Sequence, residues 1–232
     1  MYKVIFVDID GTLTDDKGVI YSYVVSALER LRKKNIKVIL TSGNAYVIAV
    51  GLAYYLPVYR FVVAENGAVI GFWKNYRVIG NTEAALKAKA LVVERLKSVV
   101  YESWQNEFRI ADFAFVPREG ITMDQATYLI RSAVKGLPVQ VDHSGWAIHI
   151  RDVGVNKGTG IREACDVLNI EPWEAIAIGD SDTDVSMFKE VGIGIALGNS
   201  TAKLRDVATY ITNNKFGLGF VEAVKKIEEI IS

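Results

Sequence analysis

Carboxylates are concentrated in two short stretches of the chain, and each stretch directly follows a run of apolar residues. The first is DIDGT at residues 8–12, and the second is GDSDTD at residues 179–184. Because successive side chains alternate along a strand, Asp8 and Asp10 can point into the same space. Gly11 allows a sharp turn after them. For this stretch taken alone, a plain turn whose carboxylates accept backbone N–H groups stays open.

The second stretch carries more acidic groups than a helix start requires. Asp182 or Ser181 could cap a following helix, but this leaves Asp180 and Asp184 unexplained. Carboxylates crowded behind an apolar strand repel each other unless a cation lies between them. Ligation by oxygen alone suits Mg²⁺. If the two stretches meet in the fold, we therefore expect a Mg²⁺ site.

Two further positions could hold an anion beside such a cation. Residues 41–44, TSGN, follow another apolar run. The Ser42 hydroxyl and free backbone N–H groups near Gly43 would form a phosphate cradle at a helix start, although Ser-Gly is also a common turn signal. Lys157 opens a predicted helix. Its ammonium could neutralise phosphate charge, although a lone lysine usually lies on the solvated surface.

The fold must bring these positions together, and the apolar pattern predicts how. Runs of Val, Ile and Phe without alternation indicate strands covered on both faces, as in a parallel sheet. Their alternation with amphipathic helices favours an α/β fold with a doubly wound, Rossmann-like parallel sheet, whose carboxyl edge binds ligands. We expect strands at residues 3–7, 36–40, 61–64, 175–178, 193–196 and 210–211, and helices at residues 23–34, 45–55, 157–168, 182–190 and 220–231.

The pattern changes in the middle of the chain. We expect a hairpin at residues 69–79, helices at 82–97 and 123–135, a strand at 109–116, and a second hairpin from 139–142 and 146–150. Here the strands alternate more, which is typical of a sheet with one face in water. We therefore predict a catalytic core formed by residues 1–80 and 152–232, and a smaller inserted α/β cap formed by residues 81–151.

The composition argues against several classes of protein. The chain has 27 basic and 27 acidic residues, and this balance is unlike that of a nucleic-acid binder. No apolar run approaches the roughly 20 residues of a membrane span, and the first apolar run is too short for a signal peptide. The single cysteine, Cys165, lies in a helical pattern and is expected to be buried. We expect a cytoplasmic protein without nucleic-acid or membrane partners.

Taken in order, four motifs resemble those of haloacid dehalogenase superfamily phosphatases. They are DIDGT at residues 8–12, Ser42-Gly43, Lys157, and GDSDTD at residues 179–184. Residues 184–199 and AENG at residues 64–67 are similar to the branch that includes the Cof-like sugar phosphatases and sucrose-phosphate phosphatase, whose members carry an α/β cap after the third core strand. The short cap and Ser42-Gly43-Asn44 most resemble archaeal-type phosphoglycolate phosphatases. Asn44 is a departure, because many Cof-like members carry arginine there.

The resemblance implies Mg²⁺-dependent hydrolysis of a phosphate monoester through an aspartyl-phosphate. It makes Asp8 the nucleophile. It makes Asp10 the acid that protonates the leaving oxygen and then the base that deprotonates water. The implied metal ligands are Asp8, the backbone carbonyl of Asp10, Asp180 and, directly or through water, Asp184. The groups implied to bind the phosphoryl group are Ser42, the N–H groups around Gly11 and Gly43, and Lys157.

The implied substrate is a small-molecule phosphate monoester, with phosphoglycolate first and a sugar or polyol phosphate as the alternative. A cap would select it by closing over the core. Candidate cap contacts are Arg109, Trp104 and His143, although a surface position, the cap core and a turn would also explain them. Trp73, Tyr76 and Trp104 fit either a core or a contact surface between two copies, so a homodimer stays open.

Three other functions remain as alternatives. A receiver-like binding module, in which an aspartate is phosphorylated only as a signal, would share the acidic Mg²⁺ pocket and the lysine, but it would need neither Asp10 nor a cap. A phosphomutase or phosphotransferase on the same core would pass the phosphoryl group to an alcohol instead of water. A regulatory protein that has lost catalysis is the third, although the acidic set is complete.

Overall fold

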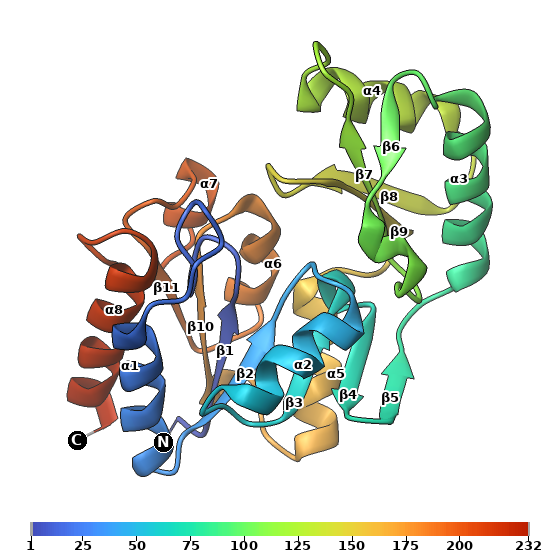
Figure 1. Cartoon of the computed structure of the whole chain (residues 1–232). Helices are drawn as coiled ribbons and strands as arrows, with labels where there is room; N and C mark the ends of the chain where they lie inside the picture. Colours follow the sequence, from blue (N-terminus) through green and yellow to red (C-terminus); the bar gives the residue numbers. More distant parts are fainter. Residues whose placement is uncertain (1, 232) are drawn as a thin grey trace.

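Two sheets organise the chain in the computed structural model, which describes residues 2–231 (Figure 1). The larger sheet has eight strands in the order β12-β11-β10-β1-β2-β3-β4-β5. From β12 to β3 the strands are parallel, whereas β4 and β5 run antiparallel to their neighbours. The strands are β1 (Val4–Asp8), β2 (Lys37–Thr41), β3 (Phe61–Ala64), β4 (Val69–Phe72), β5 (Asn75–Val78), β10 (Ala175–Gly179), β11 (Ile193–Ala196) and β12 (Tyr210–Ile211).

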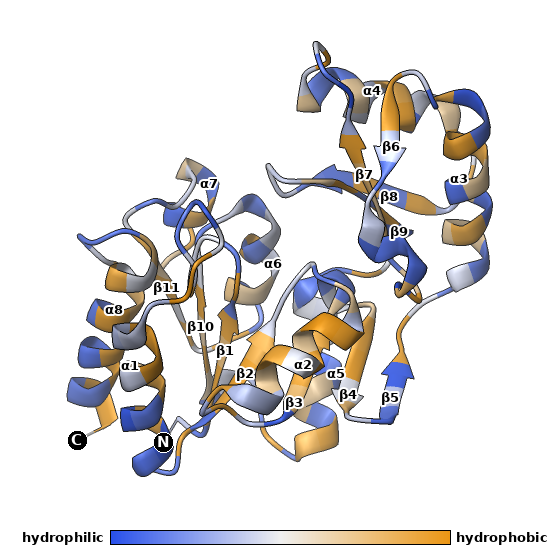
Figure 2. Cartoon of the chain, in the orientation of Figure 1, coloured by the Kyte–Doolittle hydropathy of each residue, from blue (hydrophilic) through white to orange (hydrophobic). Residues whose placement is uncertain are grey.

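Helices cover both faces of the larger sheet, and alternate residues of the central strand show why. Ile5 and Val7 of β1 pack with helices on one face, while Val4 and Phe6 pack with helices on the other. A strand buried on both faces needs apolar residues at every position, which explains its unbroken apolar run (Figure 2). The helices of the first face are α1 (Ser22–Lys33), α2 (Tyr46–Tyr55) and α8 (Phe216–Ile231), and those of the second are α5 (Lys157–Leu168), α6 (Val185–Phe188) and α7 (Ala202–Arg205).

The smaller sheet is antiparallel and has the order β6-β7-β9-β8. Two helices cover one of its faces, and the opposite face is turned toward the larger sheet (Figure 1). On β9, Ile148 and Ile150 join the apolar cluster under the helices, so His149 and Arg151 point the other way. These elements are α3 (Thr82–Arg95), β6 (Val100–Glu102), β7 (Phe113–Pro117), α4 (Met123–Ala133), β8 (Val139–His143) and β9 (Ile148–Asp152).

The chain crosses between the two sheets twice, and the two crossings lie side by side. It leaves the larger sheet after β5 and returns after β9 to enter α5. At the crossings the backbone N–H of Asn81 donates to the Asp152 carboxylate at 2.9 Å. The predicted fold class, a doubly wound parallel-sheet core with a smaller inserted α/β cap, is confirmed. Below, the smaller sheet with α3 and α4 is called the cap.

The structure corrects several predicted elements. The strand expected at residues 109–116 begins only at Phe113, because the carboxylate of Glu65 accepts the N–H groups of residues 110–112 and keeps them out of a strand ladder. The short elements β6 and α7 were not predicted from the pattern. The helix expected at residues 182–190 is divided into a 3₁₀ turn at Asp182–Asp184 and the short helix α6.

Two further expectations concern burial and membrane spans. Cys165 is fully buried in α5, as expected, and burial raises the pKa of its thiol to about 12. Among residues 2–231, the structure contains no helix with the length and apolar character that crossing a bilayer requires.

Candidate active site

The two acidic stretches and the lysine meet at the carboxyl edge of the larger sheet. Asp8 is the last residue of β1, Asp180 follows β10, and these two strands are neighbours. The Lys157 ammonium, at the start of α5, donates to Asp8 Oδ1 and to Asp184 Oδ1, both at 2.6 Å. Carboxylate oxygens of Asp8, Asp180 and Asp184 lie within 4.8 Å of one another. The predicted convergence of distant acidic residues is therefore present in the fold.

Electrostatics shows that one lysine does not balance this cluster. Burial raises the pKa of Asp8 well above its usual value, although Lys157 opposes the rise. Burial and then the charge of Asp184 raise the pKa of Asp180 to about 7. Burial disfavours the charged form of Lys157, but Asp184 and Asp8 outweigh it and raise the lysine pKa. A bound cation would relieve this excess of negative charge, and the all-oxygen donor set fits a hard divalent ion.

Neighbouring groups hold the acidic side chains in place. Asp184 Oδ2 accepts the N–H groups of Asp180 and Ser181 at 3.0 and 2.9 Å. Asp180 accepts the Thr12 hydroxyl at 2.9 Å on one oxygen and the Asn199 amide at 3.0 Å on the other. The sequence analysis did not identify Asn199 as part of the site. Its position gives no chemical signal, since a single amide after a predicted strand, here residues 193–196, is common in any loop.

Gly11 allows the first acidic loop to pass directly over the second. Its φ is +81°, a conformation that favours glycine. A β-carbon at this position would lie 2.4 Å from Asp180 Oδ2. The Gly11 N–H donates to the Thr14 hydroxyl at 3.0 Å, so this N–H is already satisfied within its own loop. Gly11 thus serves close approach of the two loops.

A second group of contacts surrounds Asp10 and joins the core to the cap. The Asn44 amide donates to Asp10 Oδ2 at 2.6 Å and to the Ser42 hydroxyl oxygen at 3.0 Å. Asn44 in turn accepts the side-chain amide of Gln105, a cap residue, at 2.8 Å. Ser42 is fully buried, and among the described residues no group accepts the Gly43 N–H. Asn44 therefore links Asp10 to the cap.

A buried network around Glu65 and Asp112 fixes the cap against the core. The Glu65 carboxylate, which is fully buried, accepts the backbone N–H groups of residues 110–112. Asp112 Oδ2 accepts the side-chain amide of Asn66, a core residue, at 2.7 Å. The Arg109 guanidinium donates to the Gly43 carbonyl at 2.8 Å. None of these links is visible as a motif, because each joins residues far apart in the sequence.

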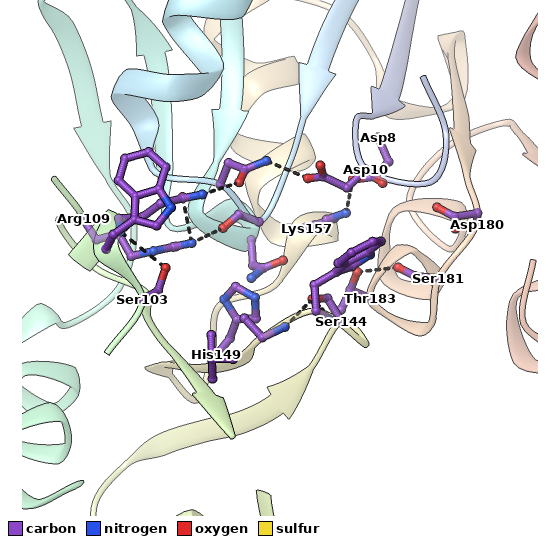
Figure 3. Close-up of a pocket in the computed structure, with 18 of the residues that line it drawn as sticks. Asp8, Asp10, Ser103, Arg109, Ser144, His149, Lys157, Asp180, Ser181 and Thr183 are labelled. Atoms are coloured by element: carbon purple, nitrogen blue, oxygen red, sulfur yellow. Dashed lines mark hydrogen bonds and ion pairs between the residues drawn. The ribbon is translucent and has the colours of Figure 1, made fainter. Parts of the chain in front are cut away.

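Core residues around the acidic cluster and the cap residues that face them line a cavity of about 340 Å³ (Figure 3). Five predicted site residues line it, while Ser42 and Asp184 are buried beside it. Arg109 and Trp104 also line it, but His143 does not and instead contacts the Asp124 carboxylate at 3.2 Å. The lining includes Asp8, Asp10, Gly43, Asn44, Asn66, Ser103, Trp104, Gln105, Arg109, Ser144, His149, Lys157, Asp180, Ser181 and Thr183.

The aromatic residues considered for a contact surface are exposed. The exposed fraction is about half for Trp73 and Tyr76 and two thirds for Trp104. Trp104 is thus not part of the cap core, whereas Arg109, considered as a surface residue, is buried.

Comparison with known proteins agrees with this geometry. A family model for haloacid dehalogenase-like hydrolases matches residues 5–100 and 94–223. A protein of Saccharolobus solfataricus named phosphoglycolate phosphatase 1 is 37% identical over 98% of this chain and 96% of its own length. A phosphoglycolate phosphatase of Metallosphaera sedula is 38% identical over 97% of this chain and 98% of its own length.

Solved structures show the same fold. Protein 0175 of Thermoplasma acidophilum has a TM-score of 0.86 at 23% identity and covers 98% of this chain and 99% of its own. A subclass IIB sugar phosphatase has a TM-score of 0.75 at 18% identity, covering 97% of this chain and 99% of its own. The resemblance predicted from the four motifs and the expected phosphatase class are thus confirmed. Acidic residues, the lysine and cap residues line one cavity, and the chain belongs to the haloacid dehalogenase-like hydrolases.

Proposed function

We propose that this chain hydrolyses small phosphate monoesters with Mg²⁺, through an aspartyl-phosphate on Asp8, and that its substrate is 2-phosphoglycolate. The observation that carries the proposal is the convergence of Asp8, Asp10, Lys157 and Asp180 on one cavity. The names of relatives with 31 to 38% identity over nearly the whole chain support the choice of substrate.

Asp8 is the group placed to attack phosphorus. Its Oδ1 is held by Lys157 at 2.6 Å, while its other oxygen makes no hydrogen bond to the described residues. Attack forms a bond between this carboxylate and phosphorus as the bond to the leaving oxygen breaks. The ammonium of Lys157 then stabilises negative charge on the transferring group.

Asp10 is the proposed proton carrier. It is exposed to the cavity two residues beyond Asp8 and is positioned by the Asn44 amide. It would protonate the leaving alkoxide in the first step and take a proton from the attacking water in the second. The buried nucleophile and the cavity-facing acid thus have separate surroundings, which suits their separate roles.

The acidic cluster is the proposed Mg²⁺ site, with Asp8, the Asp10 backbone carbonyl and Asp180 as ligands. When bound, the ion would offset repulsion between the anionic nucleophile and the anionic ester. Asp184 already uses one oxygen for Lys157 and the other for backbone N–H groups. We therefore propose that Asp184 acts through water or by orienting its neighbours.

The phosphoryl group would be held by Ser42, Gly43 and Lys157. The Ser42 oxygen accepts two hydrogen bonds from Asn44, so its own proton is available for donation. The Gly43 N–H has no acceptor among the described residues. We propose residues 81–151 as the unit that selects the substrate and residues 1–80 and 152–232 as the catalytic core.

The test is release of phosphate from 2-phosphoglycolate with Mg²⁺, alongside a panel of sugar and polyol phosphates. We expect many turnovers with phosphoglycolate and none after removal of Mg²⁺ with a chelator. Asp8→Asn should abolish turnover, because an amide is not a nucleophile for phosphorus. Asp16→Asn is the matched control, since this exposed aspartate lies on the same loop.

Three outcomes would count against the proposal. Turnover that survives in Asp8→Asn would exclude the assigned nucleophile. Stoichiometric labelling without turnover would favour a receiver-like module. Faster hydrolysis of sugar phosphates would leave the chemistry intact and replace the substrate.

A further inference from the structure

The cap contributes a histidine to the cavity that the sequence analysis did not single out. His149 lies on β9, is 3% exposed, and lines the cavity opposite the acidic loops (Figure 3). It points toward the core because the flanking residues, Ile148 and Ile150, fill the cap interior. Its Nδ1 lies 2.8 Å from Asp112 Oδ2. No described residue hydrogen-bonds its Nε2, so this atom is left for a ligand.

Asp112 fixes the orientation of this ring. It is fully buried, and the same Oδ2 accepts the Asn66 amide at 2.7 Å and has the Arg109 guanidinium at 3.5 Å. An ionised carboxylate only accepts hydrogen bonds, so the His149 Nδ1 carries a hydrogen. Since Asn66 belongs to the core and His149 to the cap, Asp112 also aligns the ring with the catalytic loops.

This cap wall presents hydrogen-bond donors to the cavity. Arg109 is always protonated, lines the cavity, and has a buried Nε without a hydrogen-bond partner. With a hydrogen on each ring nitrogen, His149 would donate to Asp112 and to a ligand at the same time. The side chains of Arg109 and His149 on this wall therefore both lie beside one buried carboxylate, that of Asp112. The Ser103 and Ser144 hydroxyls lie on the same wall.

The size of the cavity suits a small ligand. Its volume of about 340 Å³ lies at the low end of the roughly 300–1,000 Å³ that is usual for ligand pockets. This suits a phosphate ester with a two- or three-carbon acid.

We propose that His149, held by Asp112, is a specificity-determining residue that donates from Nε2 to the carboxylate of a short phosphorylated hydroxy acid. The inference rests on the proposed phosphatase function and adds the group that selects the leaving part of the substrate. Phosphate would bind at Lys157 and the carboxylate at His149, so the ester oxygen would lie between them near Asp10. A polyol phosphate, which has no carboxylate, would lose the charge-assisted hydrogen bond.

The experiment compares 2-phosphoglycolate with 2-hydroxyethyl phosphate, in which an alcohol replaces the carboxylate. We expect His149→Gln to lower kcat/KM for phosphoglycolate by about 10- to 100-fold, the usual effect of a hydrogen bond to a charged group. The value for 2-hydroxyethyl phosphate should change little. The chain has only one other histidine, His143, and His143→Gln is the matched control because it lies outside the cavity lining.

Product inhibition separates the two ends of the site. In His149→Gln the inhibition constant for glycolate should rise by a similar factor, while that for inorganic phosphate should stay unchanged. A general disturbance of the fold would weaken the binding of both products together. Should the variant fold poorly, wild-type protein still tests the proposal, since glycolate should shift the NMR signals of the His149 ring and leave those of His143 in place.

The outcomes distinguish this inference from the proposed function. Suppose that wild type hydrolyses phosphoglycolate and that His149→Gln lowers kcat/KM equally for both esters, or for neither. The proposed contact with the carboxylate is then wrong, while the proposed phosphatase function is retained. Glycolate that leaves both histidine signals unmoved also overturns it. If no phosphate ester is hydrolysed by wild type, the proposed function fails and this inference fails with it.

Discussion

Replacing Lys157 by methionine tests how the acidic cluster is stabilised. The ammonium donates to two carboxylates at 2.6 Å, and its side chain is only 3% exposed. Methionine keeps the apolar stem but leaves Asp8 and Asp184 without their shared cation. Loss of one partner from a buried ion pair usually destabilises a protein by about 3–5 kcal/mol. We expect a loss of this size in the free energy of unfolding at pH 7 in the presence of a chelator.

The loss should depend on pH and on Mg²⁺. Without the lysine, the pKa of Asp8, already raised by burial, rises further above its unfolded value. A raised folded-state pKa contributes stability that is present below the unfolded pKa and is lost as pH rises through the folded pKa. The deficit of the variant should therefore shrink from pH 8 toward pH 5. Mg²⁺ should also reduce it, because the ion binds the folded cluster.

Urea unfolding followed by circular dichroism, at several pH values with and without Mg²⁺, measures these effects. Lys203→Met is the control, because this exposed lysine pairs with Asp182 of the same acidic stretch at 2.7 Å. It should show no measurable change, as for most exposed pairs. A Lys157→Met deficit that is absent, or that is independent of both pH and Mg²⁺, would refute the reasoning.

Two further substitutions test the positioning of loops and the base of the cap. Gly11→Ala should abolish turnover and lower the melting temperature, because the alanine β-carbon would overlap Asp180 Oδ2 at a φ of +81°. Near-normal activity would show that catalysis does not need the close contact between the two acidic loops. Burial disfavours ionised Asp142, but the Arg151 hydrogen bonds at 2.7 and 2.6 Å outweigh it and lower the Asp142 pKa. A lowered folded-state pKa contributes stability that is present above the unfolded pKa and is lost as pH falls. Asp142→Asn should therefore lower the free energy of unfolding by about 3 kcal/mol at pH 7 and by less at pH 3. An equal loss at both pH values in denaturant titrations would contradict this.

The core could be predicted because its signals are local. Unbroken apolar runs mark strands buried on both faces, and polar residues directly after them must lie at one edge of a parallel sheet. The sequence alone therefore predicts that residues 8, 42 and 180 lie together. Lys157 followed from the same logic, as the first residue of a helix that returns the chain to the core.

The cap wall could not be predicted because its contacts are made between distant segments. His149 occupies an ordinary alternating position on β9, and nothing in the sequence shows that Asp112 and Asn66 will meet beside it. The error at residues 109–112 has the same origin, because a carboxylate from residue 65 takes the hydrogen bonds that a strand would use. His143 was considered as a cap contact with the substrate, yet its side chain lies outside the cavity.

The adjacent crossings at Asn81 and Asp152 have an evolutionary consequence. Since departure and return lie next to each other, where the Asn81 N–H donates to Asp152, the core strands can keep their path whatever the length of the chain inserted there. Recombination or gradual change could therefore replace one cap by another while the catalytic residues of the core keep their positions. New substrates would then be acquired through changes in the cap, while the ancestral reaction is retained.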